Sequence, residues 1–343
     1  MTTNFFAAVP HIIDDGPVEG RCHGCHNEEG NRAVLVDATG VAGVDNSATR
    51  TFRYRVCATC GTLDLLLDPG DEAALYSDGY YSFEGKTPSS LERRIIGLRN
   101  RFELGGKGVV GRAISLVWPG PHHRSIRPLI EGTIGQPLQR SARILDVGCG
   151  AGKWLKELAD QGFNNLTGVD PFLPEDAASG NVKLIKGDVQ DIDGCFDLVT
   201  IHHAFEHIAE GETALGALKE KLAPNGVLIV RIPLGASYGW RTYGGYWVQL
   251  DAPRHAHLYS TEGMKALADR VGLETKNVAF DSTSFMVTGS EATLAGMRPH
   301  KGQPIASLRT QAAFGWGRSR RIATMTNRLG TADQAAFYLT AKT

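Results

Sequence analysis

Two pairs of cysteines near the start of the 343-residue chain have the spacing of a metal site. Each pair has the form Cys-x-x-Cys, and the four residues are Cys22, Cys25, Cys57 and Cys60. Thiolates at this spacing in tight turns match the tetrahedral coordination of zinc, with four free thiols as the alternative. Four cysteines complete the coordination and leave no position for a substrate, so we expect a structural zinc site. His23 and His26 are the residues that can replace a cysteine.

A glycine-rich loop, Gly148-Cys149-Gly150-Ala151-Gly152, follows an apolar run that contains Asp146. Backbone N–H groups of a loop between a strand and a helix bind anions. A dinucleotide fingerprint, Gly-x-Gly-x-x-Gly, would need its third glycine at Lys153. Asp146 can instead pair with an ammonium while the loop binds a carboxylate, and these two groups form the amino-acid zwitterion of S-adenosylmethionine. The alternative is an ordinary tight turn.

Further polar residues follow the next strands and complete the expected cofactor pocket. Asp170 closes the second strand and is placed for ribose hydroxyls. Asp188, followed by Val189, closes the third strand and is placed for an adenine amino group. His202 or His203, after the fourth strand, can line the same pocket, and Cys149 is expected to contribute its backbone. In an open α/β sheet these positions face the ligand crevice.

Histidines in two segments are the candidate bases. The first segment, 201–208, ends in Glu206-His207-Ile208, and His207 there is either functional or structural. The second, 250–260, contains Arg254, His255, His257 and Tyr259. Methyl transfer from a sulfonium is a displacement that requires positioning of the acceptor and removal of its proton, which a neutral imidazole can do near neutral pH. We expect His255 to be the base, with His257, His207 and Tyr259 as the other candidates.

Two features near this segment suggest what the acceptor is. Arg254 can bind a phosphate or carboxylate of the acceptor, or form an ordinary salt bridge. Five aromatic residues between 238 and 247 can stack on a sugar ring or nucleobase, or belong to the core. Arg318-Ser319-Arg320-Arg321 can bind a nucleotide-sugar diphosphate, although most charge runs are solvated faces.

The order of the elements predicts two folded parts. We expect a zinc-binding domain at 1–75 with short strands at 33–37, 51–56 and 62–67, and a helical linker region at 76–140 with a helix over 91–102. From 141 to 343 strands alternate with helices, which indicates an α/β sheet. The expected strands are 142–147, 166–169, 182–185, 196–201, 226–232, 275–280 and 335–340; the expected helices are 153–161, 214–222 and 261–271.

From Ser141 onward the loop Leu-Asp-Val-Gly-Cys-Gly-Ala-Gly and the two acidic residues that follow it resemble the class I S-adenosylmethionine-dependent methyltransferases. The resemblance implies a Rossmann-like sheet of seven strands with the last antiparallel, preceded here by a small zinc-ribbon-like domain. The segment 250–260 is also similar to sugar-modifying methyltransferases with an N-terminal zinc domain, in which a Glu-His pair precedes Tyr-x-Ser. Arg254 stands at the Glu position and His255 at the His position, and Leu75–Tyr81 resembles the stretch after the zinc domain of that group.

Composition limits the class of partner. The net charge is −1 and 21% of the residues are charged, which argues against a surface built mainly for nucleic acid. A small-molecule acceptor, a sugar or nucleotide-linked sugar, is therefore favoured over RNA, which is the enzymatic alternative. A scaffold with a degenerate cofactor fold is the non-enzymatic alternative. No signal peptide or membrane span is recognisable, so we expect a cytoplasmic protein, and Cys195 is expected to be a buried small side chain.

Overall fold

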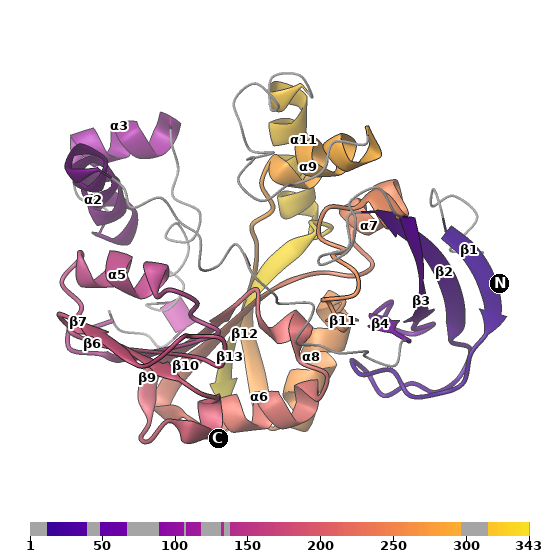
Figure 1. Cartoon of the computed structure of the whole chain (residues 1–343), viewed down its shortest axis with the longest axis horizontal. Coiled ribbons are helices and arrows are strands. Elements are labelled where there is room, and N and C mark those ends of the chain that lie inside the picture. The colour runs from indigo at the N-terminus through magenta and orange to yellow at the C-terminus, as the bar shows by residue number, and fades with distance from the viewer. Residues whose placement is uncertain are drawn as a thin grey trace.

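The computed structural model describes residues 12–39, 49–66, 89–105, 108–117, 132–133, 138–295 and 315–342. Two sheets organise the chain, a large one built from residues after 142 and a smaller one built mainly from the N-terminal residues (Figure 1). The similarity noted at Leu75–Tyr81 lies outside the described residues. Among the helices that are described, none is both long enough and apolar enough to cross a bilayer.

The large sheet has the strand order β12-β13-β10-β9-β5-β6-β8-β7. Its strands in chain order are β5 (Arg143–Val147), β6 (Asn165–Asp170), β7 (Ala177–Ser179), β8 (Val182–Lys186), β9 (Phe196–His202), β10 (Leu222–Pro233), β12 (Leu273–Phe280) and β13 (Gln334–Ala341). The central pairings are parallel, and β13 runs antiparallel to both β10 and β12, which confirms the antiparallel last strand. The expected count of seven is wrong by one, because the short edge strand β7 pairs antiparallel with β8.

Helices cover both faces of this sheet. Its helices and turns are α5 (Lys153–Ala159), η1 (Val189–Asp191), η2 (Phe205–His207), α6 (Gly211–Glu220) and α8 (Thr261–Arg270). Leu155 and Leu158 of α5 pack on one face, whereas Leu215 of α6 and Leu267 of α8 pack on the other. The buried strand residues alternate between these two clusters, as expected for a sheet covered on both sides.

The smaller sheet has the order β1-β2-β3-β4-β11, and it is antiparallel throughout. Its strands are β1 (Ile12–Pro17), β2 (Arg32–Thr39), β3 (Thr49–Val56), β4 (Leu63–Leu65) and β11 (His257–Leu258). The last of these comes from the histidine-rich segment 250–260, so the candidate active-site region pairs directly with the N-terminal strands.

The remaining helices comprise one that was expected over 91–102 and others that the sequence pattern did not predict. They are α2 (Ser90–Gly105), α3 (Val109–Val117), α7 (Tyr238–Tyr243), η3 (Gly244–Tyr246), α9 (Phe285–Leu294) and α11 (Trp316–Leu329). Trp240, Tyr243 and Trp247 are buried in one cluster with the N-terminal sheet. The aromatic stretch is therefore largely core, which removes it as a platform for stacking on a sugar. Helices α9 and α11 lie together beyond the sheet, at the top of Figure 1.

Candidate active site and metal centre

The four paired cysteines converge on one point. Their sulfur atoms all lie within 4.8 Å of one another. The Sγ atoms of Cys22 and Cys60 are 3.7 Å apart, and those of Cys25 and Cys57 are 3.5 Å apart. These separations are close to the edge of a tetrahedron of thiolates around zinc, about 3.8 Å for Zn–S bonds of about 2.3 Å. Hydrogen bonds from the Cys22 and Cys60 thiols lower the pKa of the Cys57 thiol, and the same contacts raise the pKa of the Cys22 thiol, so the four sulfur atoms share one hydrogen-bonded cluster.

The neighbouring histidines face carboxylates instead of the sulfur atoms. The Nδ1 atom of His23 lies 3.3 Å from Asp64, and the Nε2 atom of His26 lies 3.0 Å from Glu212. The residues present therefore fit a four-cysteine zinc site without a histidine ligand. Gly61, with a φ of 78°, closes the turn that follows the second pair.

Asp64 of β4 connects this metal centre to β11. Its buried carboxylate accepts hydrogen bonds from Arg55 at 3.1 Å and from His257 Nδ1 at 2.9 Å. Burial would raise the pKa of Asp64, but the hydrogen bonds from His23 and His257 bring it well below its usual value. His257 also contacts the carbonyl of Ala209 through Nε2 at 2.9 Å, so both of its ring nitrogens are engaged in holding the N-terminal sheet against the segment after η2.

The glycine loop has the backbone shape that the sequence implies. Gly148, Gly150 and Gly152 all have positive φ, and a Cβ atom on Gly148 would lie 2.5 Å from Ala204. The N–H groups of Gly148 and Cys149 donate to the Val169 carbonyl, so part of the loop is already bonded within the protein. Burial raises the pKa of the Cys149 thiol, consistent with a contribution from its backbone and not from a thiolate.

Asp170 lies against this loop. Its Oδ2 atom accepts a hydrogen bond from Gly150 N at 2.9 Å, and its Oδ1 atom accepts one from Phe172 N at 2.9 Å. The carboxylate thus fixes the loop relative to the end of β6, where a ribose of the expected cofactor would lie. Asp188 caps η1 by accepting from Val189 N at 2.6 Å, with Val189 buried behind it.

We predict that Asp170→Ala weakens the binding of S-adenosylmethionine. The substitution removes hydrogen bonds to a charged acceptor, each worth about 1.5–3 kcal/mol, and the expected loss in affinity is roughly 10- to 150-fold. Calorimetric titration of both proteins measures it. An unchanged dissociation constant would show that Asp170 does not contact the cofactor. It would also show that cofactor binding does not need the loop to be held by Asp170.

Asp146 is buried in the middle of the sheet beside Asp170. Its Oδ1 atom accepts a hydrogen bond from Thr200 Oγ1 at 2.8 Å. Burial raises the pKa of Asp146 to about 7, and the charge of Asp170 adds to the rise. Because the unfolded pKa is about 3.9, the cofactor-free fold loses stability as the pH rises through 7.

Binding of S-adenosylmethionine is therefore expected to release a proton from Asp146. An ammonium placed beside the carboxyl favours its charged form and lowers the pKa from its value of about 7. Proton release should be large at about pH 6–6.5 and vanish above about pH 8. Calorimetry in buffers with different ionisation enthalpies measures it, with Asp146→Asn as the control. A binding enthalpy that does not depend on the buffer would contradict the expected ammonium contact.

His202, expected in the cofactor pocket, and Cys195, expected in the core, both have clear positions. His202, at the end of β9, packs edge-on against Trp154 with ring centroids 5.2 Å apart. Cys195 is exposed, so the expectation of a buried small side chain is wrong. The physical reason is its place in the turn before β9, ahead of the first buried residue, Phe196.

Glu206 is the centre of a buried polar cluster next to the glycine loop. Glu206 lies two residues after Ala204, which is so close to the loop that a Cβ atom on Gly148 would clash with it. The side chain of Glu206 is 1% exposed. The Nδ1 atom of His203 lies 3.4 Å from Glu206 Oε1, and the Nε2 atom of His255 lies 3.9 Å from the same oxygen. Burial by itself would raise the pKa of Glu206, but the surrounding histidines lower it to about 2.

His255 comes from the second histidine-rich segment and is buried beside His207. The ring centroids of the two histidines are 4.8 Å apart. The Nδ1 atom of His255 donates to the Gln249 carbonyl at 2.9 Å, which leaves the lone pair on Nε2. That nitrogen lies 3.7 Å from Asp251 Oδ2. Burial, together with the charge of His207, lowers the pKa of His255 to about 4, so the imidazole is neutral at physiological pH.

Guanidinium groups border the cluster on two sides. Arg254 pairs with Asp251 at 2.5 Å, so it forms a local salt bridge of the kind that the sequence left as an alternative. Arg231 of β10 pairs with Asp281 at 2.7 Å and donates to Nε2 of His203. His203 and Asp251 have φ angles of 50° and 40°, and such left-handed backbone at a non-glycine residue is often found at functional sites.

The two remaining candidates of this segment lie away from the cluster. Tyr259 is fully buried in the core beneath the sheet, 5.6 Å from the Phe205 ring, and its burial raises its pKa. His257 is committed to Asp64 and Ala209 as described above. Sequence reasoning missed Glu206, Arg231, Asp251 and Asp281 as site residues. Only Glu206 had a local signal, because it stands between two histidines after a buried strand.

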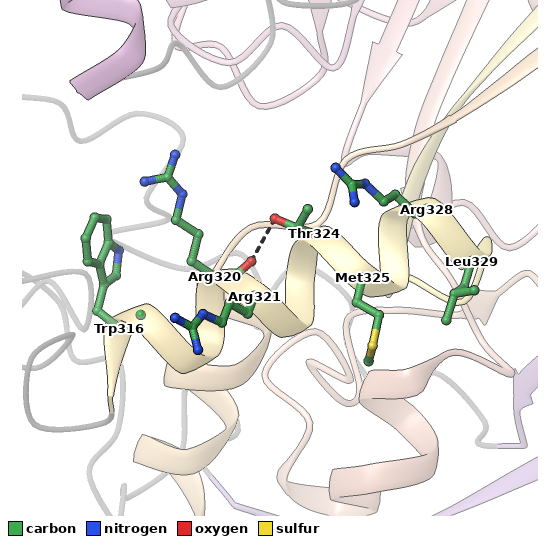
Figure 2. A pocket seen from close by; sticks show the side chains of 8 residues that line it. Trp316, Arg320, Arg321, Thr324, Met325, Arg328 and Leu329 are labelled. Atoms are coloured by element: carbon green, nitrogen blue, oxygen red, sulfur yellow. Dashed lines mark hydrogen bonds between the residues drawn. The ribbon is translucent and has the colours of Figure 1, made fainter.

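The arginine-rich segment forms an exposed face on α11. Figure 2 shows Trp316, Arg320, Arg321 and Arg328 along this helix, where they line an open surface hollow of about 600 Å³. Arg318 pairs instead with Glu291 of α9 at 2.7 Å. Asn327 donates to the carbonyl of Ser282, the neighbour of Asp281, so α11 is joined to the edge of the polar cluster.

Comparison with known proteins agrees with this geometry. Residues 122–278 match the family model of a methyltransferase domain. The trans-aconitate 2-methyltransferase of Deinococcus radiodurans is 34% identical over 104 residues, which are 28% of this chain and 40% of that protein. The chain thus spans less than half the length of this curated relative.

Two of the solved structures that align with part of this chain are the following. The cyclopropane synthase MmaA2 of Mycobacterium tuberculosis has a TM-score of 0.41 and 16% identity, covering 64% of this chain and 84% of that one. A methyltransferase from Thiobacillus denitrificans in complex with S-adenosyl-L-homocysteine has a TM-score of 0.40 and 19% identity, covering 65% and 93%. The sequence match and the glycine loop together identify residues 122–278 as an S-adenosylmethionine-dependent methyltransferase domain.

Proposed function

We propose that the whole protein transfers a methyl group from S-adenosylmethionine to a small molecule, with a sugar or nucleotide-linked sugar as the acceptor. The observation that carries the proposal is the juxtaposition of the glycine loop with the cluster of Glu206, His207 and His255. The loop side supplies the cofactor contacts through Asp146, Asp170 and Asp188. The cluster side supplies a proton acceptor near the same loop.

The cluster favours an acceptor that must lose a proton. In a displacement at the sulfonium methyl, a hydroxyl oxygen gains a bond to carbon and must release its hydrogen, whereas a carboxylate reacts without a base. His255 is the proposed base, because its Nε2 carries the lone pair and faces Glu206 and Asp251. In the similar sugar-modifying group a Glu precedes the His in sequence; here Glu206 brings a carboxylate to His255 from another segment.

The face of α11 supports a nucleotide-linked acceptor. Arg320, Arg321 and Arg328 line the same hollow, and guanidinium groups bind phosphate oxygens in a bidentate manner. Trp316 lies at the end of the hollow, where a nucleobase can stack (Figure 2). Near-neutral net charge supports a small molecule over RNA. We place the protein in the cytoplasm, where the cofactor is made.

Zinc bound by the four cysteines has a structural part in this proposal. Cys22, Cys25, Cys57 and Cys60 would hold the ion and stabilise the short strands around it. Asp64 and His257 then hold β11, and the segment that carries His255, in place.

A thermal-shift screen with S-adenosylhomocysteine present tests the acceptor class. Nucleotide sugars, free sugars and polycarboxylates such as trans-aconitate form the panel, and each hit is assayed for methyl transfer. We expect a nucleotide sugar to stabilise the protein and to be methylated. Both effects should be lost in the double variant Arg321→Ala/Arg328→Ala. Turnover with polycarboxylates alone would contradict a hydroxyl acceptor and favour a carboxylate acceptor. Binding of RNA with a steep salt dependence would contradict a small-molecule acceptor.

A further inference from the structure

Glu206, His207 and His255 have the donor set of a second metal site. Each offers one ligand atom, and the three atoms lie within 4.8 Å of one another. Two imidazoles and one carboxylate suit divalent metals of the first transition row, in contrast to the four thiolates, which select zinc. This donor set is separate from the four cysteines. Glu206 and His207 come from η2, and His255 comes from the loop before β11.

Both histidines are held in the form that binds a metal. His207 Nδ1 lies 2.9 Å from the carbonyl of Arg254, and His255 Nδ1 lies 2.9 Å from the carbonyl of Gln249. A carbonyl only accepts hydrogen bonds, so each Nδ1 carries a hydrogen, and in the neutral imidazole each Nε2 then carries the lone pair. A backbone carbonyl on the other ring nitrogen is the usual support of a metal-bound histidine.

Glu206 supplies a buried negative charge that the described residues do not neutralise with a guanidinium. Arg231 pairs with Asp281, and Arg254 pairs with Asp251, so each arginine at the cluster has its own carboxylate. Both oxygens of Glu206 are buried, and among the described residues neither accepts a hydrogen bond of good geometry, the His203 Nδ1 atom lying 3.4 Å from Oε1. A buried carboxylate in this state is costly unless a cation, either a metal ion or a proton on a neighbouring imidazole, accompanies it.

We propose that Glu206, His207 and His255 bind a divalent cation. His203 would orient the carboxylate, because Arg231 donates to its Nε2 and leaves its Nδ1 hydrogen facing Glu206 at 3.4 Å. The inference rests on the proposed function for its place near the glycine loop. With the cation present, the Nε2 lone pair of His255 would be a ligand and no longer the base, and the ion would lower the pKa of an acceptor hydroxyl, whose proton would then pass to water.

Binding of Mn²⁺ tests the site without any acceptor. Zinc-loaded protein is titrated with Mn²⁺, and the loss of the electron paramagnetic resonance signal of free Mn²⁺ is followed. Mn²⁺ does not displace zinc from thiolates, since it is the weakest binder of the divalent series. Saturation at one ion per chain is expected, with binding weakened at least about 10-fold in Glu206→Gln, because loss of a mere supporting residue already costs about 10- to 100-fold.

The surface pair His26 and Glu212 provides the matched control. Its histidine and carboxylate lie 3.0 Å apart, but among the described residues they belong to no set of three metal donors. The Glu212→Gln variant should therefore bind Mn²⁺ as tightly as the wild type does. If Glu206→Gln does not fold by circular dichroism, His207→Gln, which removes a partly exposed donor, takes its place.

Lack of saturable Mn²⁺ binding, or equal binding by Glu206→Gln and the wild type, would overturn the metal site. Methyl transfer that continues with chelator present while His255→Asn is inactive would also overturn it and leave the base proposal intact. Mn²⁺ binding that depends on Glu206, in a protein that turns over no acceptor of the panel, supports the metal site and counts against the proposed acceptor class alone.

Discussion

Replacement of Cys57 by Ser is expected to abolish stoichiometric zinc and to unfold the N-terminal sheet. The sulfur of Cys57 lies 3.5 Å from that of Cys25, so its loss opens the tetrahedral site. Structural zinc contributes about 10–16 kcal/mol of apparent binding free energy in small zinc modules, far more than short strands of three to eight residues supply by packing. Elemental analysis and hydrogen exchange of residues 12–66 measure the two effects.

The exposed Cys195 offers a matched control for this substitution. Cys195→Ser should keep one zinc per chain and normal protection of the N-terminal strands, because this cysteine lies outside the sulfur cluster. Protein that is free of metal and yet shows a protected N-terminal sheet would refute the structural role. The loss of order should also reach β11, because β4 and the Asp64–His257 hydrogen bond hold it.

Replacement of His255 by Asn should lower the rate of methyl transfer by about 10²–10⁴-fold, the usual cost of losing a general base. The asparagine amide can still donate to the Gln249 carbonyl, so the substitution removes the Nε2 lone pair and little else. Affinity for S-adenosylmethionine should remain nearly unchanged, because Asp146 and Asp170 are intact. Single-turnover kinetics with an acceptor from the panel, together with calorimetry, separate the two quantities.

His257→Asn is the comparison that distinguishes chemistry from stability. The asparagine amide can still donate to Asp64 in place of Nδ1, but the Nε2 contact with the Ala209 carbonyl is lost. We expect destabilisation of about 1–3 kcal/mol and a smaller effect on the rate than in His255→Asn. Near-normal turnover of His255→Asn, with a large loss in His207→Asn, would assign the base to η2.

Local patterns in the sequence determined the class of fold and indicated the candidate cofactor and zinc residues. The Cys-x-x-Cys spacing fixes a turn, and the run Asp146 to Gly152 fixes the end of a strand, a loop with positive φ and the start of a helix. The alternation of apolar strands with helices predicted the α/β sheet, whereas the antiparallel β13 was expected from the resemblance to class I methyltransferases. These features depend on neighbours within a few residues, which is why spacing and periodicity reveal them.

Only the tertiary structure decided which polar side chains meet. Glu206, His255 and Arg231 come from three different segments, and the parallel ends of β9 and β10 bring two of them together. The pairing of β11 with β4 joins residues that are far apart in the chain, and no local pattern specifies it. Burial also settled the aromatic stretch as core and Arg254 as the partner of Asp251. The physical reason is that a charge or an aromatic ring at a given position has the same sequence signal in a site as in a core, and only its surroundings in space distinguish the two.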